Sequence, residues 1–334
     1  MKLLYLSVHS ILEYDELRMF EDLGIDYFSL GSYVTPAHPV DQIRPPLRHN
    51  PDQWLLEHVP PREKIPQDFI DKFDVIVVMH GNVPNHNWII DNWEAMKGKR
   101  VIWRTIGQST PSIEKKMRPY VEQGLEVVRY SPKERNIENY AGENSIIRFS
   151  KSEIEYNHWV GGGTEVITFA QNMKERNNFV NYNTFLKLID GFNGRLYGVK
   201  NEASGALNGG YMSYDDMKQK IRDARVYIYT GTQPASYTLS FMEALMTGIP
   251  IVAIGSKLWN SENVAGDVYE VPDIIEHGVN GYCSDDIVEL RNCIQGLVKD
   301  KRLAERIGQA GRETAIKLFG YENIKQDWKR YLQI

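Results

Sequence analysis

The sequence is short of cysteine, of long apolar runs and of any excess of one charge. Cys283 and Cys293 are its only cysteines, too few and too unclustered for a disulfide framework or a zinc site. The longest apolar runs, such as DVIVVMH, fall far below the roughly 20 residues that span a bilayer. The N-terminal segment MKLLYLSVHSILEYDE reaches acidic residues too early for a signal peptide. A reduced, cytoplasmic protein without a transmembrane segment is therefore predicted.

Charge is spread evenly along the chain. Residues 1–160 carry 19 lysines and arginines against 23 acids, and residues 161–334 carry 20 against 21, for a net charge of -5. A protein that binds duplex nucleic acid usually has a basic domain or a basic face. Neither half has an overall basic excess, so a duplex nucleic acid partner is not expected.

Short apolar runs alternate with helical patterns along the whole chain, which is typical of parallel sheets covered by helices. The expected strands are KLLYLSV, DYFSL, DVIVVM, RVIWRTI, LEVVRYS and NSIIRFS in the first half, and EVITFAQ, GRLYGV, RVYIYT and IPIVAI in the second. The expected helices cover 12–24, 177–191, 214–224 and 238–247, with a glycine-rich turn at 206–213 and two or three helices after residue 286. The predicted fold is α/β, with two Rossmann-like halves facing each other across a hinge.

The run Gly161-Gly162-Gly163 is the predicted boundary between the halves. Consecutive glycines have a large backbone entropy and suit a hinge. The alternative is a phosphate-binding glycine loop, but the strand pattern EVITFAQ follows these glycines where such a loop requires a helix. The predicted domains are residues 1–160 and 161–320.

The stretch YTGTQPASYTLSFMEALMTGIPIVAIG, residues 229–255, joins a predicted strand to a predicted helix through small and hydroxylated residues. In open parallel sheets ligands bind at the carboxyl ends of strands, and the helix N-termini there suit phosphate. Thr232, Ser236, Tyr237 and Thr238 lie at this junction, where an anion could approach the backbone closely. The alternative is ordinary capping of the helix by Ser236 or Thr238.

Glu243 lies about one and a half turns into that helix, among apolar neighbours. A solvent-facing glutamate is the common alternative. The apolar neighbours predict burial, and a buried carboxylate without a partner is costly. We therefore expect Glu243 to meet either a ligand hydroxyl, such as those of a ribose, or a basic side chain.

Lys174 and Arg176 follow another predicted strand, in the segment FAQNMKERNNF. Two cations at a carboxyl strand end, opposite a hydroxyl-rich helix start, would bind a diphosphate. A solvated basic turn is the alternative.

Three segments of the second half occur in a familiar order: YMSYDDMKQKIRDARVYIYTG, SYTLSFMEALMTGIPIVA and DIIEHGVNGY. In them, over about residues 165–330, the chain resembles the large family of retaining nucleotide-sugar glycosyltransferases with the GT-B fold (glycosyl transferase family 4, group 1). The resemblance implies two Rossmann-like domains facing across a cleft, an acceptor-binding N-terminal one and a donor-binding C-terminal one. It also implies that the last helix, about 321–334, packs back on the N-terminal domain.

The resemblance implies roles for single residues. Glu243 corresponds to the acid that binds the donor ribose, and Arg176 to the basic residue on the diphosphate. Backbone amides at Tyr237–Thr238 would contact the distal phosphate, and the nucleobase would pack at Tyr211–Met212.

The chain departs from the family pattern at several positions, two of them in the expected donor site. The first signature acid, eight positions before Glu243, is replaced by Ala235, which leaves the donor sugar open. The arginine of the family's Gly-Arg-Leu element is Gln171 here, and we expect Lys174 to supply the missing charge. No Asp-x-Asp metal motif occurs in the chain, so helix dipoles and cations rather than a metal would stabilise the leaving diphosphate.

The N-terminal half resembles the family more loosely, in the strand–loop units FDVIVVMHGN and KRVIWRTIGQS. His80 ends one of these predicted strands, facing the expected cleft, and is a candidate catalytic residue. A histidine that is merely hydrogen-bonded at a strand end is the alternative, and His9 is a weaker candidate after the first strand.

The predicted function is metal-independent transfer of a hexose from a UDP- or GDP-sugar, UDP-sugar foremost, with retention of anomeric configuration. The acceptor would be a hydroxyl of a glycan, a glycolipid or a small molecule, and no prosthetic group is expected. The alternatives are a sugar-nucleotide-binding protein without turnover, a transferase acting on modified DNA bases, and an epimerase or phosphorylase of the same fold. An oxidoreductase is disfavoured because no G-x-G-x-x-G follows any predicted strand.

Overall fold

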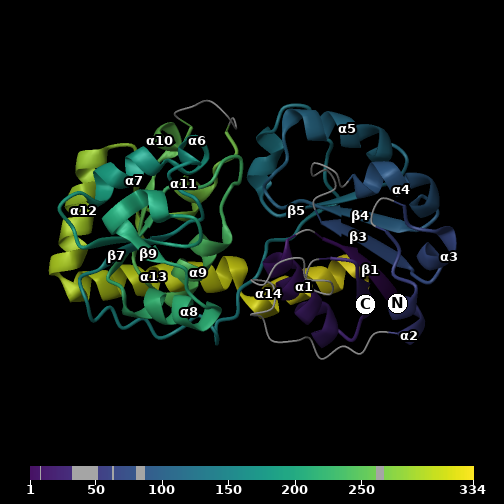
Figure 1. Ribbon diagram of the computed structural model, residues 1–334, viewed down its shortest axis with the longest axis horizontal. Coiled ribbons are helices and arrows are strands. Elements are labelled where there is room, and N and C mark those ends of the chain that lie inside the picture. Colours follow the sequence, from purple (N-terminus) through teal and green to yellow (C-terminus); the bar gives the residue numbers. More distant parts are fainter. Residues whose placement is uncertain (8, 32–51, 62–63, 80–86, 261–266) are drawn as a thin grey trace. The chain divides into compact units, whose positions relative to one another are not determined.

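Two parallel sheets form the centres of two units in the computed structural model, which describes residues 1–7, 9–31, 52–61, 64–79, 87–260 and 267–334 (Figure 1). Unit 1 comprises Met1–Ser150 and Glu322–Ile334, and unit 2 comprises Lys151–Tyr321. The chain therefore leaves unit 1 once and returns to it with its last helix.

Unit 1 is built on a six-stranded sheet in the order β2-β1-β3-β4-β5-β6, and all neighbouring strands are parallel. The strands are β1 (Lys2–Leu6), β2 (Asp26–Ser29), β3 (Val75–Met79), β4 (Arg100–Arg104), β5 (Glu126–Arg129) and β6 (Ser145–Ile146). The helices are α1 (Ser10–Asp22), α2 (Gln53–Glu57), α3 (Gln67–Ile70), α4 (Trp88–Met96), α5 (Pro111–Val121) and α14 (Tyr321–Leu332), with a 3-10 helix at Pro132–Asn136.

Helices cover both faces of this sheet, and the middle residues of β3, β4 and β5 are accordingly apolar and buried. Leu4 and Leu6 of β1 belong to the core that also contains residues of α3, α4 and α5, whereas Tyr5 packs on Phe20 of α1. Helices α4 and α5 lie on one side of the sheet and α1 and α14 on the other (Figure 1). Trp328 of α14 is fully buried and lies edge-on to the same Phe20, with ring centroids 5.2 Å apart. The prediction that the C-terminal helix packs on the N-terminal half is confirmed.

Unit 2 contains a second parallel six-stranded sheet, in the order β12-β11-β10-β7-β8-β9. Its strands are β7 (Val166–Phe169), β8 (Gly194–Tyr197), β9 (Asn208–Gly210), β10 (Val226–Tyr229), β11 (Ile251–Ile254) and β12 (Tyr282–Ser284). Its helices are α6 (Asn177–Val180), α7 (Tyr182–Ile189), α8 (Tyr214–Asp223), α9 (Leu239–Thr247), α10 (Ser256–Trp259), α11 (Val271–Ile274), α12 (Ile287–Lys299) and α13 (Lys301–Phe319), with a 3-10 helix at Glu202–Leu207. In Figure 1, α7 and α12 lie on one face of the sheet and α8, α9 and α13 on the other.

Helices α9 and α13 approach closely at two glycines. Helix α9 ends at Gly248, which has a φ of 88°. A Cβ atom added to Gly308 of α13 would lie only 2.0 Å from the Gly248 carbonyl oxygen. Any side chain at residue 308 would therefore push α13 away from the helix that carries Glu243.

The structure corrects three predictions in unit 2. The helix expected over 177–191 is broken at Asn181, whose left-handed backbone (φ 56°) separates α6 from α7. The turn expected at 206–213 contains the short edge strand β9, and β12 was not anticipated. The boundary between the units falls after Ser150 rather than at residue 160.

The glycine run is part of unit 2 because its neighbours are hydrogen-bonded there. The Val160 and Gly161 N–H groups both donate to the Arg222 carbonyl, at 2.8 and 3.0 Å. The Gly161 carbonyl in turn accepts from the buried guanidinium of Arg225, at 2.9 and 3.1 Å. These contacts fix the segment that glycine content alone marks as a hinge.

Candidate functional site

The strand order of unit 2 reverses between β7 and β10. From β7 the chain adds β8 and β9 on one side, and it then adds β10, β11 and β12 on the other. The connections after β7 and β10 therefore leave in opposite directions, and in parallel sheets this switch point is where ligands bind. Gln171, Lys174 and Arg176 follow β7, and Thr232 and Ser236–Thr238 follow β10. The structure thus brings these two predicted groups to one edge of one sheet.

Direct hydrogen bonds join the two connections. The Thr230 Oγ1 hydroxyl donates to the Val180 carbonyl at 2.6 Å, and the Asn181 side-chain amide donates to the Thr230 carbonyl at 3.1 Å. The Gln233 N–H donates to the Phe179 carbonyl at 2.7 Å. The loop after β10 is therefore held against the segment that follows β7.

The start of α9 has no capping hydrogen bond from the side chain of its N-cap residue. Thr238 occupies the N-cap position but makes no capping hydrogen bond, and its Oγ1 lies 3.1 Å from the Ser240 hydroxyl. The capping alternative therefore does not describe Thr238. The Tyr237 ring is buried against Phe319, with centroids 5.2 Å apart, so the ring itself is closed to a ligand.

Within the described residues, the side chains of Lys174 and Arg176 each make one hydrogen bond, to a backbone carbonyl group. Lys174 Nζ donates to the Ala203 carbonyl at 3.0 Å, and Arg176 Nη1 donates to the Gln171 carbonyl at 3.3 Å. Neither has a carboxylate partner among the residues that the structure describes. Two cations without counter-charge at the switch point favour an anionic ligand.

Tyr211 and Met212 follow β9, two strands from the switch point along the sheet. The Tyr211 side chain is 53% exposed. Its ring is therefore open to stacking on a planar group.

Glu243 is buried, as expected, and it has a basic partner. Its Oε1 accepts from Lys151 Nζ and from the Tyr156 hydroxyl, both at 2.9 Å. Its Oε2 accepts no hydrogen bond from the described residues. One oxygen of the carboxylate thus has two protein partners, and the other has none among the described residues.

Lys151 and Tyr156 were missed by sequence reasoning. Both lie in KSEIEY, the first residues of unit 2, 92 and 87 positions before Glu243. No periodicity or motif in that segment indicates a buried cation. Only the position of α9 against the start of unit 2 reveals the pairing.

The carboxyl edge of the sheet in unit 1 was the predicted location of His80 and, less strongly, His9. His80 lies outside the described residues. His9 caps α1, its Nδ1 accepting from the Leu12 N–H at 3.4 Å. This contact gives the His9 side chain a local structural role.

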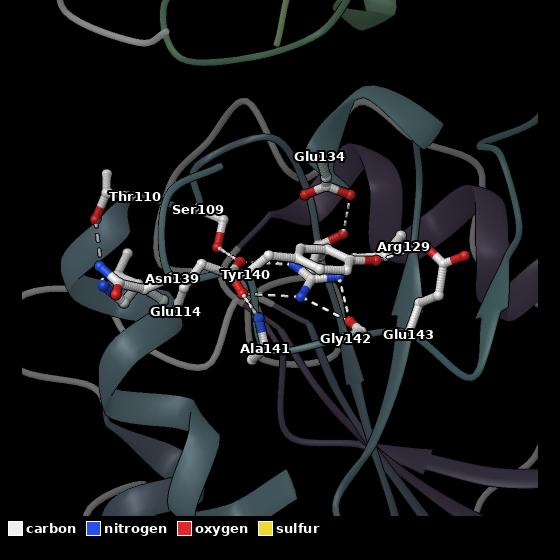
Figure 2. A network of polar contacts seen from close by, with 12 residues as sticks. Ser109, Thr110, Glu114, Arg129, Glu134, Asn139, Tyr140, Ala141, Gly142 and Glu143 are labelled. Carbon is white, nitrogen blue, oxygen red and sulfur yellow. Dashed lines mark hydrogen bonds and ion pairs between the residues drawn. The ribbon is translucent and has the colours of Figure 1, made fainter. Parts of the chain in front are cut away.

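A buried polar network occupies this edge beyond β4 and β5, as Figure 2 shows. Arg129 donates to both oxygens of Glu114, at 2.6 and 2.9 Å, and neither side chain has any exposed surface. Arg129 also donates to the Gly142 carbonyl at 2.8 Å, and its guanidinium lies 4.4 Å from the Tyr140 ring centroid. The network fixes the first turn of α5 and the loop 139–143 to the end of β5.

Glu134 lies in the same network but is only half satisfied. Its Oε2 accepts from the Thr105 hydroxyl at 2.7 Å and from the Tyr130 N–H at 3.2 Å, whereas Oε1 is buried without a partner. Burial raises the pKa of the Glu134 carboxyl to about 7, although Arg129 opposes the rise. Nothing in the sequence distinguishes this glutamate from the exposed Glu138 four residues later.

Glu134→Gln is expected to become more stable relative to the wild-type protein as the pH rises. The folded-state pKa of about 7 exceeds the ordinary value of 4.5, so the folded protein holds a proton that the unfolded chain releases between these values. Stability from this group is therefore present at low pH and lost as pH rises toward 7. Between pH 5 and 8 the difference in free energy of unfolding between Glu134→Gln and the wild-type protein should change by about 2 kcal/mol in favour of the variant.

Urea titrations at pH 5, 6, 7 and 8 measure this difference, with Glu138→Gln as the exposed control. A difference that stays constant over the range, as for Glu138→Gln, would show that Glu134 is ionised when folded.

No family model and no curated protein matches the sequence. Solved structures do match. Anabaena Alr3699/HepE in complex with UDP-glucose has a TM-score of 0.66 at 14% identity, covering 100% of this chain and 99% of that chain. A glycosyltransferase from Rickettsia africae has a TM-score of 0.65 at 12% identity, covering 99% and 98%. The pneumococcal O-GlcNAc transferase GtfA in complex with UDP and GlcNAc has a TM-score of 0.55 at 12% identity, covering 80% and 59%.

Together with the two parallel six-stranded sheets, these similarities show that the chain has the GT-B fold, as predicted. Across the described ranges, none of the helices combines the length and the apolar content needed to traverse a bilayer. The same ranges contain no cluster of three or more histidine, cysteine or acidic side chains placed to hold a metal ion.

Proposed function

We propose that this protein is a glycosyltransferase that moves a hexose from a nucleoside diphosphate sugar, foremost a UDP-sugar, to an acceptor hydroxyl. The observation that carries the proposal is Glu243, a buried carboxylate near the switch point of unit 2, with one oxygen held by the protein and the other without a partner among the described residues. A free carboxylate oxygen accepts from hydroxyl groups such as those of a ribose.

The diphosphate would lie over the start of α9, between the connections after β7 and β10. The uncapped N–H groups of α9 and its partial positive charge suit phosphate. Lys174 and Arg176 would stabilise the negative charge that develops on the leaving diphosphate, and the nucleobase would pack at Tyr211–Met212. This set provides charge without a metal ion, so we propose metal-independent transfer.

The proposal includes retention of the anomeric configuration because the sequence resembles that of retaining glycosyltransferases. The acceptor hydroxyl would attack the anomeric carbon from the face that the diphosphate leaves, and a diphosphate oxygen would take its proton. In such a reaction the protein acts mainly by orientation and by leaving-group electrostatics. The UDP and UDP-glucose in the HepE structures, and the UDP and GlcNAc in the GtfA structure, support a uridine nucleotide as donor.

A sugar-nucleotide-binding protein without turnover is the second candidate. It is favoured by Ala235, which carries no carboxylate at the position of the first signature acid. Such a protein would bind the donor and release no nucleotide with any acceptor.

A thermal-shift screen of UDP, GDP, ADP and TDP tests the proposal. UDP at 100 times its dissociation constant is expected to stabilise the protein by about 2.7 kcal/mol, and GDP less. Lys174→Ala should weaken UDP binding several-fold, whereas Lys187→Ala, an exposed lysine of α7, should leave it unchanged. Absence of a shift with every nucleotide would contradict the proposal, and binding without nucleotide release would select the second candidate.

A further inference from the structure

The ion pair between Lys151 and Glu243 is almost fully buried. The Lys151 side chain is 1% exposed and the Glu243 side chain 7%. Lys151 is the first residue of unit 2, and its N–H donates to the Phe319 carbonyl at 2.9 Å. The place where the chain enters unit 2 therefore also supplies the cation for the acid of the candidate donor site.

Tyr156 gives the same carboxylate oxygen a second donor. Its hydroxyl lies 2.9 Å from Glu243 Oε1 and 2.9 Å from the Tyr214 hydroxyl, and Tyr214 reaches Glu155 Oε2 at 3.2 Å. Tyr214 begins α8, two residues after Met212. Tyr156, near the start of unit 2, thus contacts both Glu243 and Tyr214, which lies next to the segment at which the nucleobase would pack.

Arg312 of α13 also holds the first residues of unit 2 in place. Its Nη2 donates to the Glu153 carbonyl at 2.8 Å, and its Nη1 donates to the carbonyls of Tyr156 and Met246. Met246 lies near the end of α9, one turn beyond Glu243. The segment 151–156 is therefore held along α9 by polar contacts at both Glu243 and Met246.

We propose that Lys151 and Tyr156 are positioning residues for Glu243: they occupy Oε1 so that Oε2 alone is presented to the ribose hydroxyls of a nucleoside diphosphate. A carboxylate oxygen has about two acceptor sites, and the Lys151 ammonium and the Tyr156 hydroxyl fill both on Oε1. The ammonium also offsets the cost of burying the carboxylate, which a single hydroxyl could not do. The inference rests on the proposed function, because it assumes that Glu243 meets a ribose.

The test compares UDP with 2′,3′-dideoxyuridine diphosphate, which lacks the ribose hydroxyls, by titration calorimetry. The wild-type protein is expected to prefer UDP about tenfold or more, because hydrogen bonds to a charged group are strong. Tyr156→Phe keeps the ring and removes one donor, and should reduce the preference to about threefold. Lys151→Met should abolish it and Lys151→Arg restore part of it, whereas Lys187→Met, the exposed control, should leave it unchanged.

Affinity for the dideoxy nucleotide should stay the same in every folded variant. If Tyr156→Phe and Lys151→Met instead weaken both nucleotides equally, or keep the full preference, the pair is only structural and the positioning role is overturned. Tyr156→Phe decides the question by itself if Lys151→Met does not fold. A wild-type protein that binds neither nucleotide would overturn the proposed function itself, which separates the two failures.

Discussion

Glu243→Gln is expected to reduce sugar transfer about 100-fold, equivalent to about 3 kcal/mol in the activation barrier. The amide keeps the size of the side chain and leaves a carbonyl oxygen for Lys151 Nζ, which lies 2.9 Å from Oε1 in the wild-type protein. Its NH2 group then replaces Oε2 and cannot accept from a ribose hydroxyl. The lost hydroxyl acceptor accounts for the slower transfer. The buried Lys151 ammonium keeps a hydrogen-bond acceptor but loses its counter-charge, so some loss of stability is also expected and the melting temperature measures it separately.

The measurement is the rate of UDP release from UDP-sugars with an acceptor panel, together with the melting temperature of each variant. Alanine is a poorer choice at this position, because it would leave the buried Lys151 ammonium unpaired, and breaking a buried pair costs about 3–5 kcal/mol. Glu313→Gln, at an exposed position of α13, controls for the loss of one carboxylate. A near-normal rate for Glu243→Gln would remove Glu243 from the donor site.

Glu114→Ala is expected to destabilise the protein by about 3–5 kcal/mol, because it leaves the Arg129 guanidinium buried without its carboxylate. The carboxylate of Glu114 also accepts from the Ser109 hydroxyl at 2.5 Å and from the Ala141 N–H at 2.8 Å. These donors lose their partner in the same substitution (Figure 2). The double variant Glu114→Leu with Arg129→Met removes both charges and should recover much of the loss.

Urea unfolding measures both effects, and Arg135→Ala provides the control. Arg135 belongs to the same region and pairs with Glu143, but its side chain is 56% exposed, so its removal should cost less than about 1 kcal/mol. Equal losses for Glu114→Ala and Arg135→Ala would mean that the buried pair contributes no more than a surface pair.

Much of the fold follows from the sequence because its signals are local. The apolar runs at β1, β3, β4, β10 and β11 are short and flanked by helical patterns, and only a parallel sheet covered on both faces buries such runs completely. Helix α9 was predicted to within a residue at its start, and Gly248 ends it in a left-handed conformation, as its position after the apolar pattern suggests. The break at Asn181 was missed because asparagine adopts the left-handed region only in a suitable tertiary context.

The candidate site, like the fold, was predicted from the sequence only in part. Sequence order placed Lys174, Arg176 and the 232–238 loop after strands, and the reversal of strand order between β7 and β10 then brings them to one edge. Burial of Glu243 followed from its apolar neighbours, and a basic partner was one of two expected outcomes. The identity of that partner had no sequence signal, since Lys151 resembles any surface lysine until the chain is folded.

The sequence by itself determined the α/β class, most of the strands, the loop after β10 and the burial of Glu243, because each depends on spacing and hydrophobicity within a short window. Only the tertiary structure decided where the units divide, which side chains neutralise Glu243 and Arg129, and which oxygens stay open. Those outcomes depend on contacts between residues from 15 to 92 positions apart, and the low dielectric of the interior makes each contact energetically decisive.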